Sequence, residues 1–171
     1  MNHIVLYHPE IPQNTGNIMR TCVAVNAKLH LIEPLGFSLD EKYVKRSAAN
    51  YLEHLDYQLY PSLEAFFEQN HGAFYIFSRY GQKRPDQLDL SDTQQEHYYL
   101  FGAESTGLPK AFLEQHLDKT FRLPMSDKVR SLNLSNCAAI VLYEAMRQQD
   151  YPGLFEHEPE IFKGKDYLKK L

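Results

Sequence analysis

The hydrophobic residues of this chain recur in short runs that alternate with amphipathic stretches. Apolar runs of strand length occupy residues 3–7, 28–32, 56–60, 73–77, 98–101 and 121–123. Amphipathic segments with helical spacing begin after Asn14, at Asp40, at Pro61, at Pro109 and at Leu134. Strands alternating with helices are joined by βαβ crossovers, which build parallel sheets. The pattern therefore predicts an α/β fold, a mostly parallel sheet with helices on both faces, whose ligand site lies at the carboxyl ends of the strands.

The strongest helical pattern runs from Leu134 to Arg147. Its apolar positions recur at helical spacing, with Leu134, Ala138, Val141 and Ala145 on one face and Tyr143 on another. Asn133 directly precedes it and is expected to cap the helix, because its side-chain oxygen can accept from free N–H groups of the first turn. A helix start this rich in Ser and Asn favours a polar or anionic ligand, although a simple capped core helix has the same pattern.

Two further polar stretches follow predicted strands. NTGNIMR opens with Asn14, a candidate N-cap, and places Asn17 and Arg20 on a face away from Ile18. GAESTGLP, which begins at Gly102, is neither GxGxxG nor a P-loop. The missing GxGxxG argues against a dinucleotide-dependent oxidoreductase. Taken alone, NTGNIMR is more typical of an ordinary capped helix with a solvated arginine, and GAESTGLP is a weak signal that a tight turn would also give.

Composition narrows the choice further. The chain has 171 residues, 43% of them hydrophobic, which suits one domain, and no apolar run is long enough to cross a membrane. Its net charge of −4 means that any nucleic-acid binding depends on local basic patches. Cys22 and Cys137 have no metal-ligand spacing and are expected to be reduced core residues of a cytoplasmic protein without a metal.

Taken together, NTGNIMR, GAESTGLP and RLPM…RSLNLSNCAAIVLYEAMR resemble the three motifs of the SPOUT methyltransferases. The similarity runs from about His3 to about Pro152 and is greatest to the small TrmL (YibK-type) tRNA 2′-O-methyltransferases. It implies a single domain over residues 1–152, with a deep trefoil knot within about 73–149, and a tail over 153–171. It also implies a homodimer with a shared active site, which transfers methyl from S-adenosylmethionine (AdoMet) to a tRNA ribose 2′-oxygen and releases S-adenosylhomocysteine. For this subgroup the acceptor is the wobble nucleotide, position 34, a cytidine or modified uridine of the anticodon stem-loop.

The resemblance also assigns residues. The expected AdoMet pocket consists of Phe77, Gly102, Glu104, Gly107, Leu123, Met125, Ser131 and Leu132. The expected catalytic or ribose-placing residues are Arg20, Asn133, Ser135 and Tyr143. Ala103 and Thr106 depart from the subgroup, which usually has Pro and Arg there, so a role of that Arg does not carry over to this chain.

Arg20 admits two roles, that of a base and that of a ligand for the neighbouring phosphate. A guanidinium stays protonated in ordinary settings, which favours the phosphate role. Three basic clusters are expected to contact RNA, namely Lys42, Lys45 and Arg46; Arg79, Lys83 and Arg84; and Lys128 and Arg130. Methylation of another tRNA position or of rRNA, and a non-catalytic RNA-binding dimer of the same fold, remain open.

Overall fold

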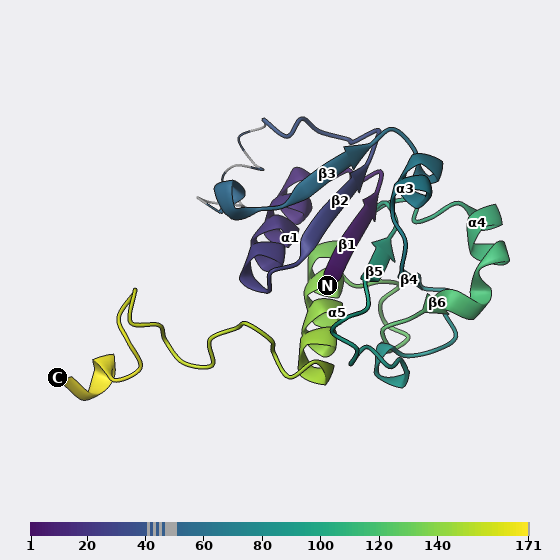
Figure 1. The fold of residues 1–171 in the computed structure, drawn as a ribbon. Helices are drawn as coiled ribbons and strands as arrows, with labels where there is room; N and C mark the ends of the chain where they lie inside the picture. Colours follow the sequence, from purple (N-terminus) through teal and green to yellow (C-terminus); the bar gives the residue numbers. More distant parts are fainter. Residues whose placement is uncertain (41, 43, 45, 47–50, 171) are drawn as a thin grey trace.

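The computed structural model describes residues 1–40, 42, 44, 46 and 51–170, and it contains a six-stranded sheet (Figure 1). Every strand pair in the sheet is parallel, in the order β3-β2-β1-β5-β4-β6. The α/β prediction is therefore confirmed. The strands are β1 (Asn2–Tyr7), β2 (Lys28–Ile32), β3 (Tyr57–Tyr60), β4 (Ala73–Phe77), β5 (His97–Phe101) and β6 (Thr120–Phe121).

Four α-helices alternate with these strands in the described part of the chain, and short 3₁₀ turns cover 52–54, 85–87, 117–119 and 167–170. The helix predicted over 40–49 falls largely outside the described residues, of which 42, 44 and 46 are helical. The bounds are α1 (Pro12–Ala24), α3 (Leu63–Gln69), α4 (Lys110–Gln115) and α5 (Leu134–Gln148).

The sheet separates two hydrophobic cores, because side chains alternate along each strand. Ile4 and Leu6 of β1 pack with α1 and α5, and Val5 packs on the opposite side with residues of α3 and α4. Figure 1 shows α1 and α5 together on one side of the sheet, with α3 and α4 on the other. The apolar face predicted for α5 is confirmed, since Ala138, Val141 and Ala145 are fully buried.

Two local predictions are wrong. Asn14 does not cap α1: the helix begins at Pro12, Ile11 occupies the N-cap position without a side-chain bond, and Asn14 is buried in the first turn. Proline at the first helical position supplies the required φ and needs no partner for an N–H, so the helix begins three residues earlier than expected. The last strand covers 120–121 rather than 121–123. By contrast, Asn133 caps α5 as predicted, accepting from the backbone N–H groups of Ser135 and Asn136.

The chain after α5 leaves the body of the fold. Figure 1 shows this yellow segment running away from the sheet to the C-terminus. It carries exposed aromatic and aliphatic side chains and ends in a 3₁₀ turn at Tyr167–Lys170. Across the described residues, none of the helices combines the length and apolar character needed to span a bilayer.

Candidate active site

A pocket of about 490 Å³ opens at the carboxyl ends of β4, β5 and β6. The last residue of each strand is a phenylalanine, and the strand register places Phe77 beside both Phe101 and Phe121. The ring centroids are 5.2 Å apart for Phe77 and Phe101 and 6.1 Å apart for Phe77 and Phe121. These rings are almost fully buried, so they form an apolar floor of the kind that small-molecule sites use.

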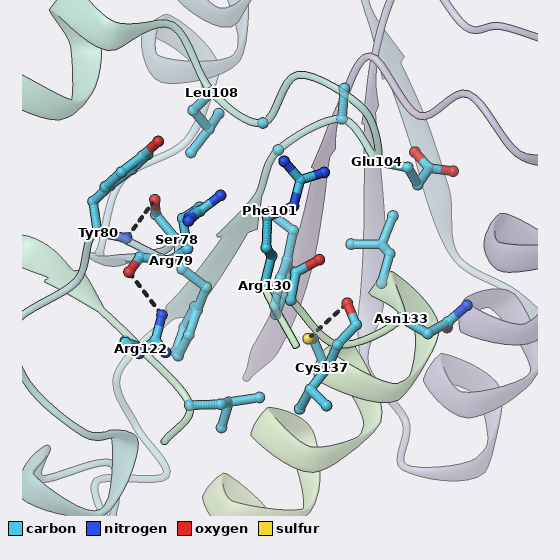
Figure 2. Close-up of a pocket in the computed structure, with 18 of the residues that line it drawn as sticks. Ser78, Arg79, Tyr80, Phe101, Glu104, Leu108, Arg122, Arg130, Asn133 and Cys137 are labelled. Atoms are coloured by element: carbon cyan, nitrogen blue, oxygen red, sulfur yellow. Dashed lines mark hydrogen bonds between the residues drawn. The ribbon is translucent and has the colours of Figure 1, made fainter. Parts of the chain in front are cut away.

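The loops that follow these strands complete the pocket. Figure 2 shows Ser78, Arg79, Tyr80 and Arg122 on one side of it and Glu104 and Asn133 on the other. Each of the eight residues expected to bind the cofactor lines this pocket: Phe77, Gly102, Glu104, Gly107, Leu123, Met125, Ser131 and Leu132. The sequence motifs thus converge on one place, although their individual contacts to a cofactor stay a prediction.

The turn after β5 is closed on itself. The N–H of Ala103 donates to the carbonyl of Gly107 at 3.2 Å, and the N–H of Gly107 donates to the carbonyl of Ala103 at 2.8 Å. A Cβ on Gly102 would lie 2.3 Å from the carbonyl carbon of Gly107, so a side chain there would force the turn open. Gly107 has φ +67° and open space where its Cβ would be. Gly107 thus lines the pocket without a side chain, and the space that a side chain would enter is open.

Glu104 binds the segment that leads into α1. Its Oε1 accepts the N–H of Glu10 at 2.9 Å, and its Oε2 accepts the N–H of Ile11 at 2.7 Å and the side-chain amide of Asn14 at 3.3 Å. A carboxylate that accepts N–H groups at a helix start is favoured both by these bonds and by the helix dipole. The carboxylate of Glu104 thus holds the first motif against the second.

The same chain of bonds reaches the third motif. Asn133 Nδ2 donates to Asn14 Oδ1 at 3.0 Å, while Asn133 Oδ1 accepts the N–H of Ser135 at 2.9 Å. The donor-to-acceptor direction of this chain of hydrogen bonds is fixed at both ends, because the backbone N–H of Ser135 can only donate and the carboxylate of Glu104 can only accept. The order Ser135–Asn133–Asn14–Glu104 therefore links the N-termini of α5 and α1 to the turn after β5.

The four residues expected to act in catalysis are not gathered in this pocket. Asn133 lines it, and the hydroxyl of Ser135 donates to Asn133 Oδ1 at 2.5 Å. Arg20 lies on the exposed face of α1, with its guanidinium carbon 5.1 Å from the ring centroid of Tyr51. Tyr143 is 48% exposed on α5 and borders a different hollow, next to the chain after α5.

The basic residues divide in a similar way. Arg79 and Arg130 line the pocket, whereas Lys128, Lys83 and Arg84 are exposed outside it. The guanidinium of Arg84 is already engaged by Asp86, at 2.9 and 3.1 Å, and this pairing raises the pKa of Arg84 and lowers that of Asp86. In the remaining cluster, Lys42 and Arg46 are exposed and Lys45 lies outside the described residues.

Several residues in and beside the pocket were not found from the sequence. Asn14, which lines the pocket, was assigned a local cap. Glu10, which lies next to the pocket-lining Ile11, was not considered, yet its carboxylate accepts from the N–H and hydroxyl of Ser105 at 3.2 and 2.7 Å. These bonds lower the pKa of Glu10. Arg122 and Tyr80 also line the pocket. The available signal was proximity to an element end: Arg122 directly follows β6, Tyr80 lies in the loop after β4, and Glu10 and Asn14 lie on either side of the first residue of α1.

The two thiols differ in their surroundings. Cys22 is fully buried in the core, and burial raises its pKa to about 12, which makes it the inert core residue that was expected. Cys137 is only partly buried: it packs against the same core, as expected, and it also lines the pocket. In the described part of the chain, His, Cys, Asp and Glu form no group of three or more that could hold a metal, and the metal-free reaction stays a prediction.

Comparison with known proteins adds an independent line of support. The profile of the SpoU rRNA Methylase family matches residues 1–143. A Geobacillus stearothermophilus protein named "Putative tRNA (cytidine(34)-2'-O)-methyltransferase" is 50% identical over 153 residues, which are 89% of this chain and 98% of that relative.

Solved structures agree with the sequence comparison. A structure described as "Structural insights into the 2-OH methylation of C/U34 on tRNA" is 41% identical, with a TM-score of 0.80, over 88% of this chain and 97% of that one. The SpoU methyltransferase AviRb from Streptomyces viridochromogenes, in complex with the cofactor AdoMet, is 26% identical with a TM-score of 0.72. It is matched over 86% of this chain and 57% of its own.

Proposed function

This chain belongs to the SpoU rRNA methylase family, and from that membership we propose that it is a tRNA 2′-O-methyltransferase that acts on nucleotide 34. The convergence of all eight motif-derived residues on one pocket at the strand ends carries this proposal. The names of the relatives, which specify cytidine 34 or C/U34, support the choice of acceptor.

The pocket fits AdoMet in size and chemistry. A volume of about 490 Å³ is in the range of small-molecule sites, and the floor of three phenylalanines suits a flat purine. The open space at Gly107 leaves room in the wall beside it. When bound, AdoMet supplies a methyl group already activated by its sulfonium. Phe77, Gly102 and Gly107, with the loop 123–132, would hold it.

The protein's own task is then to place the ribose and to stabilise charge on its 2′-oxygen. Asn133 is fixed by its bonds to Asn14 and Ser135, so it offers a rigid polar group at the pocket edge. Arg20, with a permanently protonated guanidinium, binds the phosphate next to the acceptor ribose. Arg79 and Arg130 draw the RNA backbone to the opening.

We further propose that two copies share each active site. Arg20 and Tyr143 do not line the pocket of their own chain, so the expected set of residues is incomplete in one copy. Ile140 and Tyr143 are 47% and 48% exposed on the outer side of α5, which suits a contact with a second copy.

The other proposals are a single domain over 1–152 and a trefoil knot within about 73–149. The position of β5 between β1 and β4 supports a non-sequential path of the chain.

The test is transfer of labelled methyl from AdoMet to tRNA that lacks this modification, followed by mapping of the labelled nucleotide. We expect label on the 2′-oxygen of nucleotide 34 in an anticodon stem-loop. Label on another tRNA position or on rRNA would keep the enzyme class and overturn the acceptor. AdoMet binding without transfer to any RNA would favour the non-catalytic RNA-binding dimer.

A further inference from the structure

The loop after β4 is clamped to β6 by backbone bonds. The N–H of Ser78 donates to the carbonyl of Phe121 at 3.0 Å, and the N–H of Arg122 donates to the carbonyl of Lys83 at 2.8 Å. A Cβ on Gly81 would lie 2.2 Å from the carbonyl carbon of Phe121, so only glycine lets the loop approach this closely. The tip of the loop, Arg79 and Tyr80, is therefore held in a defined place.

Tyr80 differs from the other aromatic residues of the pocket. Its side chain is 63% exposed, whereas Phe77, Phe101 and Phe121 are less than a tenth exposed. The guanidinium of Arg79 lies over its ring, 5.4 Å from the centroid. The peptide group between Arg79 and Tyr80 is fixed as well, since the Tyr80 N–H donates to Ser78 Oγ at 3.2 Å and the guanidinium of Arg122 donates to the carbonyl of Arg79 at 2.9 Å (Figure 2).

Two guanidinium groups lie close to Tyr80. Arg79 lies over its ring and Arg122 bonds to the carbonyl of Arg79, while Arg130 lines the same pocket. An exposed aromatic ring on a rigid loop, beside several guanidinium groups, offers both a stacking surface and contacts for phosphates. Single-stranded RNA loops are recognised in this way, by unstacked bases that lie on aromatic side chains or guanidinium planes.

We propose that Tyr80 and Arg79 form a stacking platform for a base of the anticodon loop adjacent to the methylated nucleotide. The proposal rests on the proposed function and adds a positioning residue to it. The buried phenylalanine floor would contact the adenine base of the cofactor, whereas the exposed ring of Tyr80 at the pocket rim is available to an RNA base. Because every base has a π-face, the platform would orient the loop without selecting its sequence.

Steady-state kinetics tests this platform. In Tyr80→Ala we expect the KM for the anticodon stem-loop to rise about tenfold while AdoMet affinity, measured by calorimetry, is unchanged; base stacking supports an effect of this size. Tyr80→Phe keeps the ring and should stay close to wild type. Tyr57, which is 43% exposed on the edge strand β3, provides the matched control as Tyr57→Ala. An unchanged KM in Tyr80→Ala would overturn the proposal.

Fluorescence provides a readout that does not depend on turnover. The chain contains no tryptophan, so Tyr80→Trp creates a single reporter at the platform. We expect the anticodon stem-loop to quench this emission, AdoMet alone to leave it unchanged, and Tyr57→Trp to respond to neither. Quenching by AdoMet alone, or weaker AdoMet binding in Tyr80→Ala, would assign the ring to the cofactor and overturn the proposal. If the wild type transfers no methyl to nucleotide 34, the proposed function fails. Quenching of the Tyr80→Trp emission by RNA would still show whether a base stacks on this position.

Discussion

The side-chain amide of Asn133, which caps α5, donates to Asn14 in the first turn of α1 at 3.0 Å. The two residues are 119 positions apart, and the side-chain amide of Asn14 in turn donates to the carboxylate of Glu104. A single line of hydrogen bonds therefore joins all three sequence motifs at one edge of the pocket. Its integrity should affect both the stability of the fold and the affinity of the pocket.

Replacing Asn133 with alanine should have both effects. We expect Asn133→Ala to lower the free energy of unfolding by about 1–2 kcal/mol, because α5 loses its cap, and to weaken AdoMet binding measured by calorimetry. Ser62→Ala removes the cap of α3, where Ser62 Oγ accepts the N–H of Ala65 at 3.1 Å, at a helix start outside the pocket. It should cost about 1 kcal/mol with no change in AdoMet affinity. Equal AdoMet affinities in both variants would contradict the link between the cap and the pocket.

Gly107 allows a test of the pocket wall itself. Both Gly107 and Gly153 have positive φ, +67° and +75°, so alanine should cost each about 1 kcal/mol of backbone strain. Only Gly107→Ala would also add a methyl group at a residue that lines the pocket. We expect AdoMet affinity to fall about tenfold or more in Gly107→Ala and to be unchanged in Gly153→Ala. Similar affinity in both variants would place the cofactor away from this turn.

The hydrophobic pattern was sufficient to predict the sheet and both of its helical layers. Strand position and helical faces follow from periods of two and 3.6 residues, which are local properties of the sequence. The resemblance of the motifs then predicted the pocket residues, including Phe77 and Leu123, which no local pattern would single out. Asn133 was predicted as a cap because a capping side chain bonds to the backbone only two or three residues away.

What the sequence did not reveal depends on contacts between distant segments. Asn14 resembles a cap in the sequence, but the helix already begins at Pro12. The side-chain amide of Asn14 bonds instead to Glu104 and Asn133, which are 90 and 119 positions away. Glu104 was expected to bind the cofactor, and both of its oxygens accept N–H groups from the segment that leads into α1. The exposed placement of Arg20 and Tyr143 relative to the pocket is likewise a property of the folded chain, not of either motif alone.

A buried histidine pair makes stability depend on pH. His30 is fully buried and bonds through Nε2 to His3 Nδ1 at 2.9 Å and through Nδ1 to the Tyr60 hydroxyl oxygen at 2.8 Å. Burial, with added repulsion from His3 and Lys28, lowers the pKa of His30 to about 3. Between that value and an unfolded pKa of about 6.5, the unfolded chain binds a proton that the native chain does not. Stability should therefore fall as pH decreases in this window.

Urea unfolding at pH 7.5 and at pH 5 measures this effect. His30 alone should lower the free energy of unfolding by about 2 kcal/mol between these values, from 1.36 kcal/mol per pKa unit, and burial lowers the pKa of His3 as well. The dependence should be reduced in His30→Gln and retained in His157→Gln, which alters an exposed residue after α5. Equal stability of the wild type at both pH values would contradict the buried neutral state.

The salt dependence of RNA binding should distinguish the arginines near the pocket. Each phosphate contact contributes about −0.7 to −0.9 to the slope of log K against log salt concentration. Arg130 lines the pocket, and Arg130→Ala is expected to remove about one such contact. Arg84 is already paired with Asp86 at 2.9 Å, so Arg84→Ala should change the slope less. Filter binding of the anticodon stem-loop across a salt series measures both, and a larger effect in Arg84→Ala would reverse the assignment.

A shared active site predicts complementation between two inactive variants. Arg20→Ala should lower turnover at least about a hundredfold, as loss of one transition-state contact does, without changing AdoMet affinity, because Arg20 lies outside the pocket of its own chain. Gly107→Ala keeps Arg20 and weakens the pocket, so the assay uses an AdoMet concentration low enough that Gly107→Ala alone transfers little methyl. A dimer of these two variants, purified through two different tags, contains one pocket that is intact and one Arg20 that is intact, on different chains.

If Arg20 acts on the pocket of the other copy, this mixed dimer has one complete site and about half of wild-type activity. If Arg20 acts on its own pocket, neither site is complete and the mixed dimer is inactive. The control is a dimer of wild type with the double variant Arg20→Ala, Gly107→Ala, for which the two expectations are reversed. Activity in the first dimer and not in the second requires that Arg20 complete the pocket of its neighbour. The opposite result would place the whole site within one chain, and would require α1 to approach its own pocket more closely than it does in this structure.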